Sequence, residues 1–290
     1  MLRHRLFFGT LMTVLFTAVV LFDGWLDGGI TASAADDKAV QGTILCLLIA
    51  LLAIPAQLEF SKLACAKNIR IFKPVSILGS ILFAGIWYWP QLTTITLQMY
   101  VLFLSVFVLL GLFLYQWFYY GTLGVISNCG ANFFSIIYLG FLSSFVLGIR
   151  LDFGLWELLM FIFVVKSADI GAYTIGKLFG SHKFSPAISP GKTWEGMAGA
   201  VAVAIAVAVL FAVFFGIMGV LSAALFGLCF AFIGQLGDLV ESMLKRDAEQ
   251  KDSASPDSTG IPGFGGLLDV IDSPLAAAPF AYLFFFFSVS

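Results

Sequence analysis

Residues 196–237 read GMAGAVAVAIAVAVLFAVFFGIMGVLSAALFGLCFAFIGQLG and contain no Asp, Glu, Lys, Arg or His. A helix needs about 20 apolar residues to cross a bilayer, so this run is long enough for two crossings joined almost without a loop. Lipid accepts only helices and closed barrels, and apolar runs of this length exclude the short strands of a barrel. The chain is therefore predicted to be an all-α polytopic membrane protein.

Apolar runs of similar length recur along the whole chain. The sequence is 60% hydrophobic and 11% charged, whereas a soluble domain has about 25% charged residues. We predict about nine transmembrane helices, five in an N-terminal region, 1–150, and the rest in a C-terminal region, 151–290, with cytoplasmic loops at 166–195 and 238–273. The candidate spans lie at roughly 6–22, 41–58, 74–90, 97–117, 132–149, 154–170, 196–217, 218–237 and 274–290.

The N-terminal segment allows two interpretations. Ala32-Ser33-Ala34 resembles a signal-peptidase site, but the apolar run before it is long and a dozen mostly polar residues separate the two. We therefore predict that 6–22 is a first transmembrane helix rather than a signal peptide.

Loop charge supports this order of spans and predicts its orientation. With the N-terminus in the cytoplasm, only Lys38 and Arg150 fall outside, so 13 of the 15 Lys and Arg residues are cytoplasmic. Such asymmetry is typical of membrane proteins. The polar blocks 166–195 and 238–273 then both face the cytoplasm.

Other features exclude several kinds of site. The four cysteines are scattered, and the two histidines are too few and too far apart for a zinc site. There is no long basic run, and a net charge of −2 gives no indication of a nucleic-acid partner.

The densest block of charge follows the opening run directly and reads DLVESMLKRDAEQKDSASPDSTGIPGFGGLLDVIDS, residues 238–273. Asp238, Glu241, Ser242 and Lys245 share one face of a helix by their spacing. Ionisable groups near membrane depth are costly and usually mark a site. We therefore predict that Asp238, Asp269 and Asp272 bind Mg²⁺, which prefers carboxylate oxygens. The basic side chains of Lys245, Arg246 and Lys251 would hold phosphates. Gly263, Gly265 and Gly266 would let the backbone approach a ligand closely.

A second polar block, residues 164–196, lies before the opening run. Helical spacing aligns Lys166, Asp169 and Tyr173, and Ser189-Pro-Gly-Lys-Thr193 stands directly before the next helix. Amide groups at a helix N-terminus, together with Lys192, favour phosphate binding. The P-loop interpretation fails because Pro186 occupies the place of its first glycine and no strand precedes it.

Three segments of these blocks together resemble the signature of the CDP-diacylglycerol synthases, also called phosphatidate cytidylyltransferases. They are DIGAY at 169–173, SPGKTWEG at 189–196, and GDLVESMLKR at 237–246, which is followed by KD at 251–252 and PGFGGLLDVID at 262–272. The resemblance covers about 165–275, and residues 1–150 share only its hydropathy.

The resemblance implies transfer of a cytidylyl group from CTP to phosphatidate, with release of pyrophosphate. It further implies Mg²⁺ with room for a second cation, contact with membrane lipid, a homodimer, and a bacterial inner-membrane location with the site facing the cytoplasm. The catalytic residues would be Asp238, Ser242, Lys245, Arg246, Lys251 and Asp252. The substrate-binding residues would be Asp169, Tyr173, Ser189, Lys192, Thr193, Glu241, Gly265 and Gly266.

Two positions depart from the signature, because its His is Phe264 here and its Arg is Val270. The chain lacks this imidazole and this guanidinium beside the phosphates. Two alternatives therefore stay open: an enzyme with a changed substrate, and a family member that no longer catalyses the reaction. A CTP-dependent kinase of a lipid alcohol and a transporter are further alternatives. The gathering of charge at one face rather than along a path through the membrane disfavours a transporter.

Overall fold

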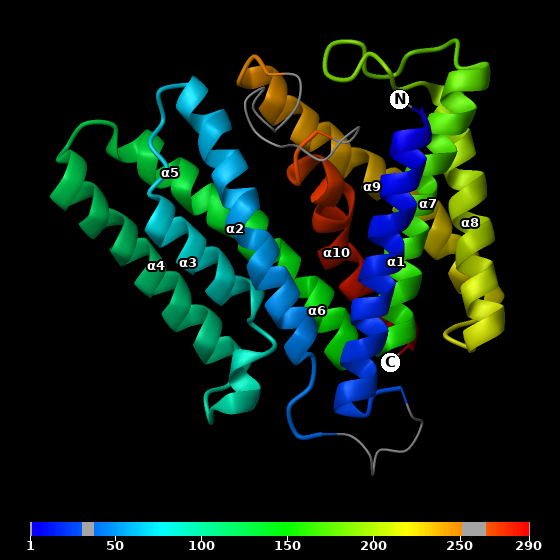
Figure 1. Cartoon of the computed structure of the whole chain (residues 1–290), viewed down its shortest axis with the longest axis horizontal. Coiled ribbons are helices and arrows are strands. Elements are labelled where there is room, and N and C mark those ends of the chain that lie inside the picture. The colour runs from blue at the N-terminus through cyan, green and yellow to red at the C-terminus, as the bar shows by residue number, and fades with distance from the viewer. Residues whose placement is uncertain (1, 31–37, 251–264, 290) are drawn as a thin grey trace.

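The computed structural model describes residues 2–30, 38–250 and 265–289, and their architecture is helical (Figure 1). Its α-helices are α1 (Leu2–Asp27), α2 (Thr43–Ala66), α3 (Lys73–Ala84), α4 (Leu97–Tyr120), α5 (Val125–Ile136), α6 (Leu142–Asp152), α7 (Leu155–Phe179), α8 (Trp194–Phe215), α9 (Val220–Asp247) and α10 (Leu268–Val289). A 3-10 turn, η1 (Trp89–Leu92), precedes α4, and a π-helical turn, η2 (Ile137–Phe141), joins α5 to α6. The all-α prediction is confirmed.

Every predicted apolar run contains helical residues, but not every one of the helices is long enough to span a membrane. Within the described ranges, seven helical segments are long and apolar enough to cross a membrane, with α5, η2 and α6 counted as one segment. The predicted span 74–90 is wrong in its length, because α3 ends at Ala84 after 12 residues. The chain turns at Gly85, where an added Cβ would lie 2.3 Å from Trp89 Nε1.

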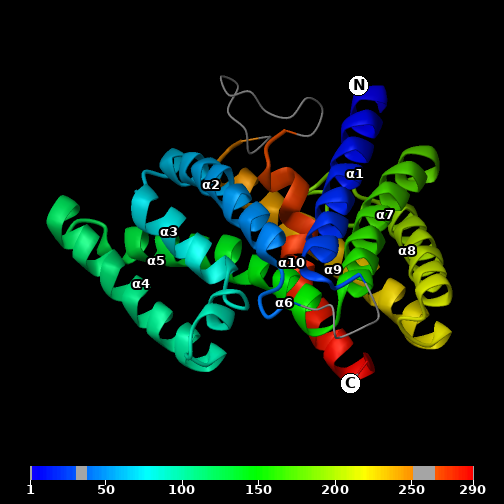
Figure 2. The same cartoon turned by 60° about the horizontal axis from the view of Figure 1, so that its bottom comes forward.

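The helices form one continuous array, with α4 at one edge and α8 at the opposite edge in both views (Figures 1 and 2). The predicted division near residue 150 falls between α6 and α7, and α10 packs against both α6 and α9. The connection 180–193 and the C-terminal end of α9 lie at the same end of the molecule as the start of α1 (Figure 1). The two polar blocks of the sequence thus share one end.

Glycines bring the helices that carry these blocks into backbone contact. A Cβ at Gly199 of α8 would lie 2.5 Å from the Cβ of Ile175 on α7. A Cβ at Gly237 of α9 would lie 2.9 Å from the Cβ of Ala276 and 3.0 Å from the carbonyl oxygen of Asp272, both on α10. Because α9 and α10 touch at Gly237, the next residue, Asp238, lies beside the first turns of α10.

A buried ionic cluster ties the helices together at the other end of the molecule. Arg150 of α6 is 3% exposed, and its Nη2 lies 2.9 Å from Asp27 Oδ1. Asp27 Oδ2 accepts a hydrogen bond from Gly42 N at 3.0 Å, and Asp23 Oδ1 accepts one from Ile44 N at 2.8 Å. The two carboxylates of α1 therefore hold the first turn of α2, whose N-cap glycine has no side chain to do so.

Replacing Arg150 by Met should destabilise the fold, because Asp23 and Asp27 would remain buried without their cation. We expect the free energy of unfolding to fall by about 3–5 kcal/mol. Thermal unfolding in detergent measures the change, with Lys38→Gln at an exposed position as the control. An unfolding midpoint that stays at the wild-type value in Arg150→Met would refute the structural role of this cluster.

Candidate active site

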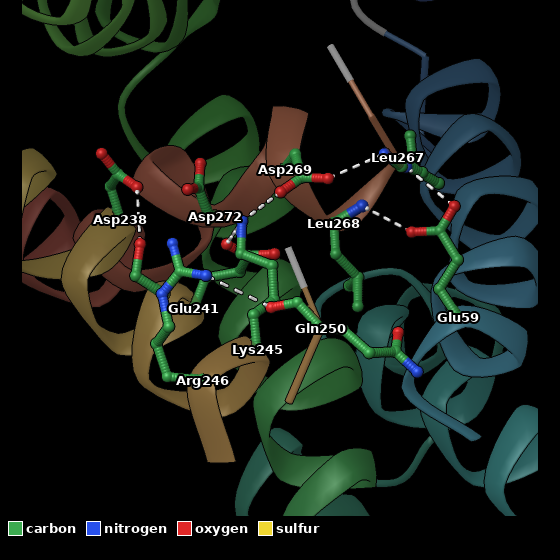
Figure 3. A network of polar contacts seen from close by, with 12 residues as sticks. Glu59, Asp238, Glu241, Lys245, Arg246, Gln250, Leu267, Leu268, Asp269 and Asp272 are labelled. Carbon is green, nitrogen blue, oxygen red and sulfur yellow. Dashed lines mark hydrogen bonds and ion pairs between the residues drawn. The ribbon is translucent and has the colours of Figure 1, made fainter. Parts of the chain in front are cut away.

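The site centres on Lys245, which lies between two carboxylates of different helices (Figure 3). Its Nζ forms ion pairs with Glu241, one turn earlier on α9, and with Asp269 in the first turn of α10. The second oxygen of Asp269 accepts a hydrogen bond from Gly266 N at 2.7 Å. Lys245 therefore joins α9 to the start of α10 through charge-assisted contacts.

Three carboxylates beside this lysine could hold a metal ion. One oxygen each of Asp238, Glu241 and Asp272 lies within 4.8 Å of the others. Glu241 is 1% exposed, and within the described part of the chain its Oε1 has no hydrogen-bond partner. A buried carboxylate oxygen without a partner is costly. A divalent cation among these three groups would remove that cost, so the donor set fits a hard ion such as Mg²⁺.

This grouping differs in one member from the ligands that the sequence predicted. Asp238 and Asp272 lie in the acidic group as predicted, whereas Glu241, predicted to bind substrate, is its third member. Asp269 is instead engaged by Lys245 and by Gly266 N. Its assignment as a ligand stays a prediction.

Lys192 brings the first polar block to this acidic group. Its Nζ lies 2.7 Å from Asp238 Oδ2 and 2.9 Å from the carbonyl oxygen of Gln235. The next residue, Thr193, is held in place as the N-cap of α8. Its Oγ1 accepts a hydrogen bond from Gly196 N at 3.1 Å. The approach of Lys192 to α9 is thus set by the start of α8.

Asp169 and Lys166 of α7 complete the polar contacts. Asp169 Oδ1 accepts a hydrogen bond from Gln235 Nε2 at 3.2 Å, and its Oδ2 lies 3.5 Å from Lys166 Nζ. Lys166 Nζ also donates to the carbonyl oxygen of Val270 at 2.7 Å. Helices α7, α9 and α10 and the segment before α8 all contribute to one site.

Other predicted residues lie at its margin. Tyr173 is 44% exposed, and its ring faces Lys177. Arg246 is exposed, and its Nε donates a hydrogen bond to the carbonyl oxygen of Ile188. Ser242 is buried, and its Oγ lies 3.5 Å from Asp238 Oδ1. Ser189 lies in the turn that leads to Lys192. The carbonyl oxygen of Ser189 accepts a hydrogen bond from the backbone N of Lys192 at 3.2 Å.

The segment before α10 is only partly described. Gly265 has a φ of 88°, which favours glycine. The backbone N of Gly266 donates the hydrogen bond that Asp269 Oδ2 accepts. Lys251, Asp252 and Phe264 lie outside the described residues.

Glu59 of α2 is a residue that the sequence analysis missed. Its two carboxylate oxygens accept hydrogen bonds from Leu267 N at 2.8 Å and Leu268 N at 2.9 Å (Figure 3). These amides begin α10, where a carboxylate is favourable because the helix dipole is positive there. A carboxylate directly after the predicted span 41–58 was the available signal. Glu59 fixes the turn that carries Asp269 and Asp272.

The arrangement defines a class of protein. It is a helical membrane protein with interleaved carboxylates and ammonium groups at one end, a set of side chains suited to phosphates and a divalent cation. More particularly, the chain belongs to the cytidylyltransferase family, whose family model matches residues 38–288.

Several relatives carry the name phosphatidate cytidylyltransferase. The protein of Pseudomonas aeruginosa is 51% identical over 122 residues, which cover 40% of this chain and 42% of the relative. The protein of Haemophilus influenzae is 40% identical over 139 residues, covering 46% and 47% respectively. The protein of Bacillus subtilis is 39% identical over 149 residues, covering 50% and 54%. The chain thus spans about half the length of the curated relatives it matches.

Removing the carboxylate of Glu59 should disturb the site from a distance. In Glu59→Ala the first amides of α10 lose their acceptor, and loss of a helix cap costs about 0.5–2 kcal/mol. We expect a lower unfolding midpoint in detergent, with Glu59→Gln intermediate because one acceptor oxygen remains. Lys62→Gln, at an exposed position on the same helix, is the control. Equal midpoints for Glu59→Ala and the control would show that the cap contributes nothing.

Proposed function

We propose that this protein is a phosphatidate cytidylyltransferase, which converts CTP and phosphatidate into CDP-diacylglycerol and pyrophosphate. One observation carries the proposal. The segments that resemble the family signature lie far apart in the sequence, yet Lys192, Asp238 and Asp272 belong to one connected set of polar contacts. The names of the relatives point to the same reaction.

The proposed reaction needs no nucleophile from the protein. A phosphate oxygen of phosphatidate attacks the α-phosphorus of CTP, the bond to the β-phosphate breaks, and pyrophosphate leaves. Both reactants are anionic, so positioning and positive charge supply most of the rate enhancement. Lys192, which pairs with Asp238 of α9, and Lys245, in the last turn of α9, are the proposed phosphate-binding cations.

A bound Mg²⁺ would supply further positive charge for the CTP phosphates and the leaving group. We propose that Asp238, Glu241 and Asp272 hold it, and the connected site supports this by its charge. Among the residues that the structure describes, the connected site holds five carboxylates and three ammonium groups: Asp169, Asp238, Glu241, Asp269, Asp272, Lys166, Lys192 and Lys245. When all of them are ionised, they leave an excess of two negative charges, which one divalent cation would balance.

The location of the site suits one lipid and one water-soluble substrate. The acyl chains of phosphatidate can remain in the bilayer while CTP arrives from the aqueous side. We propose that this side is the cytoplasm of a bacterial cell and that the membrane is the inner one, because the basic residues gather at this end. A homodimer is also proposed, on the family resemblance alone.

Removing a proposed ligand should strongly lower turnover without unfolding the protein. We expect Asp238→Asn and Asp272→Asn each to lower transfer from labelled CTP to lipid by about 100-fold or more, the scale of losing one electrostatic group at a transition state. Asp247→Asn is a matched control on α9, because its side chain is 74% exposed and contacts Lys67 away from the acidic group. Near-wild-type transfer by either variant would exclude that carboxylate as a ligand.

A further inference from the structure

Lys166 is a partly buried cation to which the proposed reaction has assigned no substrate or metal contact. It lies in α7, a helix long and apolar enough to span a membrane, and its side chain is 28% exposed. A lysine at such a position is costly unless it is paired. Its polar contacts with described residues, to Asp169 Oδ2 and to the carbonyl oxygen of Val270, lie inside the site.

The second contact falls on a position where this chain departs from the signature it resembles. That signature has an arginine where Val270 stands, so the first turn of α10 lacks a guanidinium beside its carboxylates. Lys166 Nζ lies 2.7 Å from the backbone oxygen of that same residue. A cation thus reaches the first turn of α10 from another helix.

We propose that Lys166 supplies, from α7, the positive charge that residue 270 does not carry, and that it is a positioning residue for the proposed transferase reaction. The inference rests on the proposed function. Lys166 holds the turn that bears Asp269 and Asp272, and it offsets the charge of Asp169 beside them.

The charge of the site explains why such a cation is needed. Without Lys166, the excess of negative charge among the described residues of the connected site rises from two to three, and one divalent cation no longer balances it. Both substrates are anionic, so each uncompensated carboxylate opposes their binding. The cost is larger here than at an open surface because the site is partly buried.

The hydrogen-bonding capacity of lysine fits the same role. An ammonium group has three donors, and Lys166 uses two of them on residues that the structure describes. A lysine offers a point charge, however, and cannot form the two-pronged contact of a guanidinium.

A charge-relocation experiment tests this inference on the full chain in detergent. The variants are Lys166→Gln, Val270→Arg, the double variant and Lys166→Arg, with Lys62→Gln as the exposed-lysine control. We expect Lys166→Gln to lower kcat/KM by about 10–100-fold, the scale of losing a hydrogen bond to a charged group. In the double variant, Val270→Arg should raise kcat/KM at least about 10-fold above that of Lys166→Gln alone.

The results separate a charge from a merely structural contact. The inference is overturned if kcat/KM of Lys166→Gln lies within about 3-fold of wild type. It is also overturned if the double variant is monodisperse and its kcat/KM is no higher than that of Lys166→Gln. If the double variant does not fold, Lys166→Arg decides, because it keeps the charge and should retain most activity. Activity of Lys166→Arg as low as that of Lys166→Gln would also overturn the inference.

A second readout distinguishes failure of this inference from failure of the proposed function. Wild-type protein that labels no lipid would refute the transferase proposal. Equilibrium binding of CTP with Mg²⁺ to the same variants then tests Lys166 independently. Weaker binding in Lys166→Gln that recovers in the double variant supports its role, and equal binding in all variants overturns it.

Discussion

Compensation of charge is the constraint on which the polar end of this molecule depends. Among the described residues, five carboxylates gather at one end of the molecule, on helices that are largely apolar. Such groups are stable near membrane depth only when cations and hydrogen bonds satisfy them. Lys245 meets this need by pairing with Glu241 and Asp269, and Lys192 by pairing with Asp238. These pairs also fix α9, α10 and the start of α8 relative to one another.

The rest of the fold brings those charges together. Gly237 allows α9 and α10 to touch, so Asp238 and Asp272 can share an acidic group. Glu59 holds the first amides of α10 from α2, in the N-terminal half of the chain. The N-terminal helices therefore contribute to the geometry of the site, although the signature resemblance does not extend to them.

Local patterns predicted much of this arrangement. Helical spacing placed Asp238, Glu241 and Lys245 on one face of α9, and apolar runs located the helices, because both depend only on neighbouring residues. The different positions of Asp269 and Asp272 were not predictable in this way. They depend on how the first turn of α10 docks, which Glu59 and Gly237 decide from distant parts of the chain. The early end of α3 likewise follows from the packing of Trp89 on Gly85.

The most direct test of the proposed chemistry follows the two ends of the CTP triphosphate separately. Purified protein would be incubated with Mg²⁺, phosphatidate and CTP labelled at either the α- or the γ-phosphate. For the proposed transferase, the α-label is expected to enter a lipid while the γ-label is released in pyrophosphate. A γ-label in lipid with release of CDP would instead indicate a lipid kinase, and the absence of label from lipid would contradict the proposed transferase activity altogether.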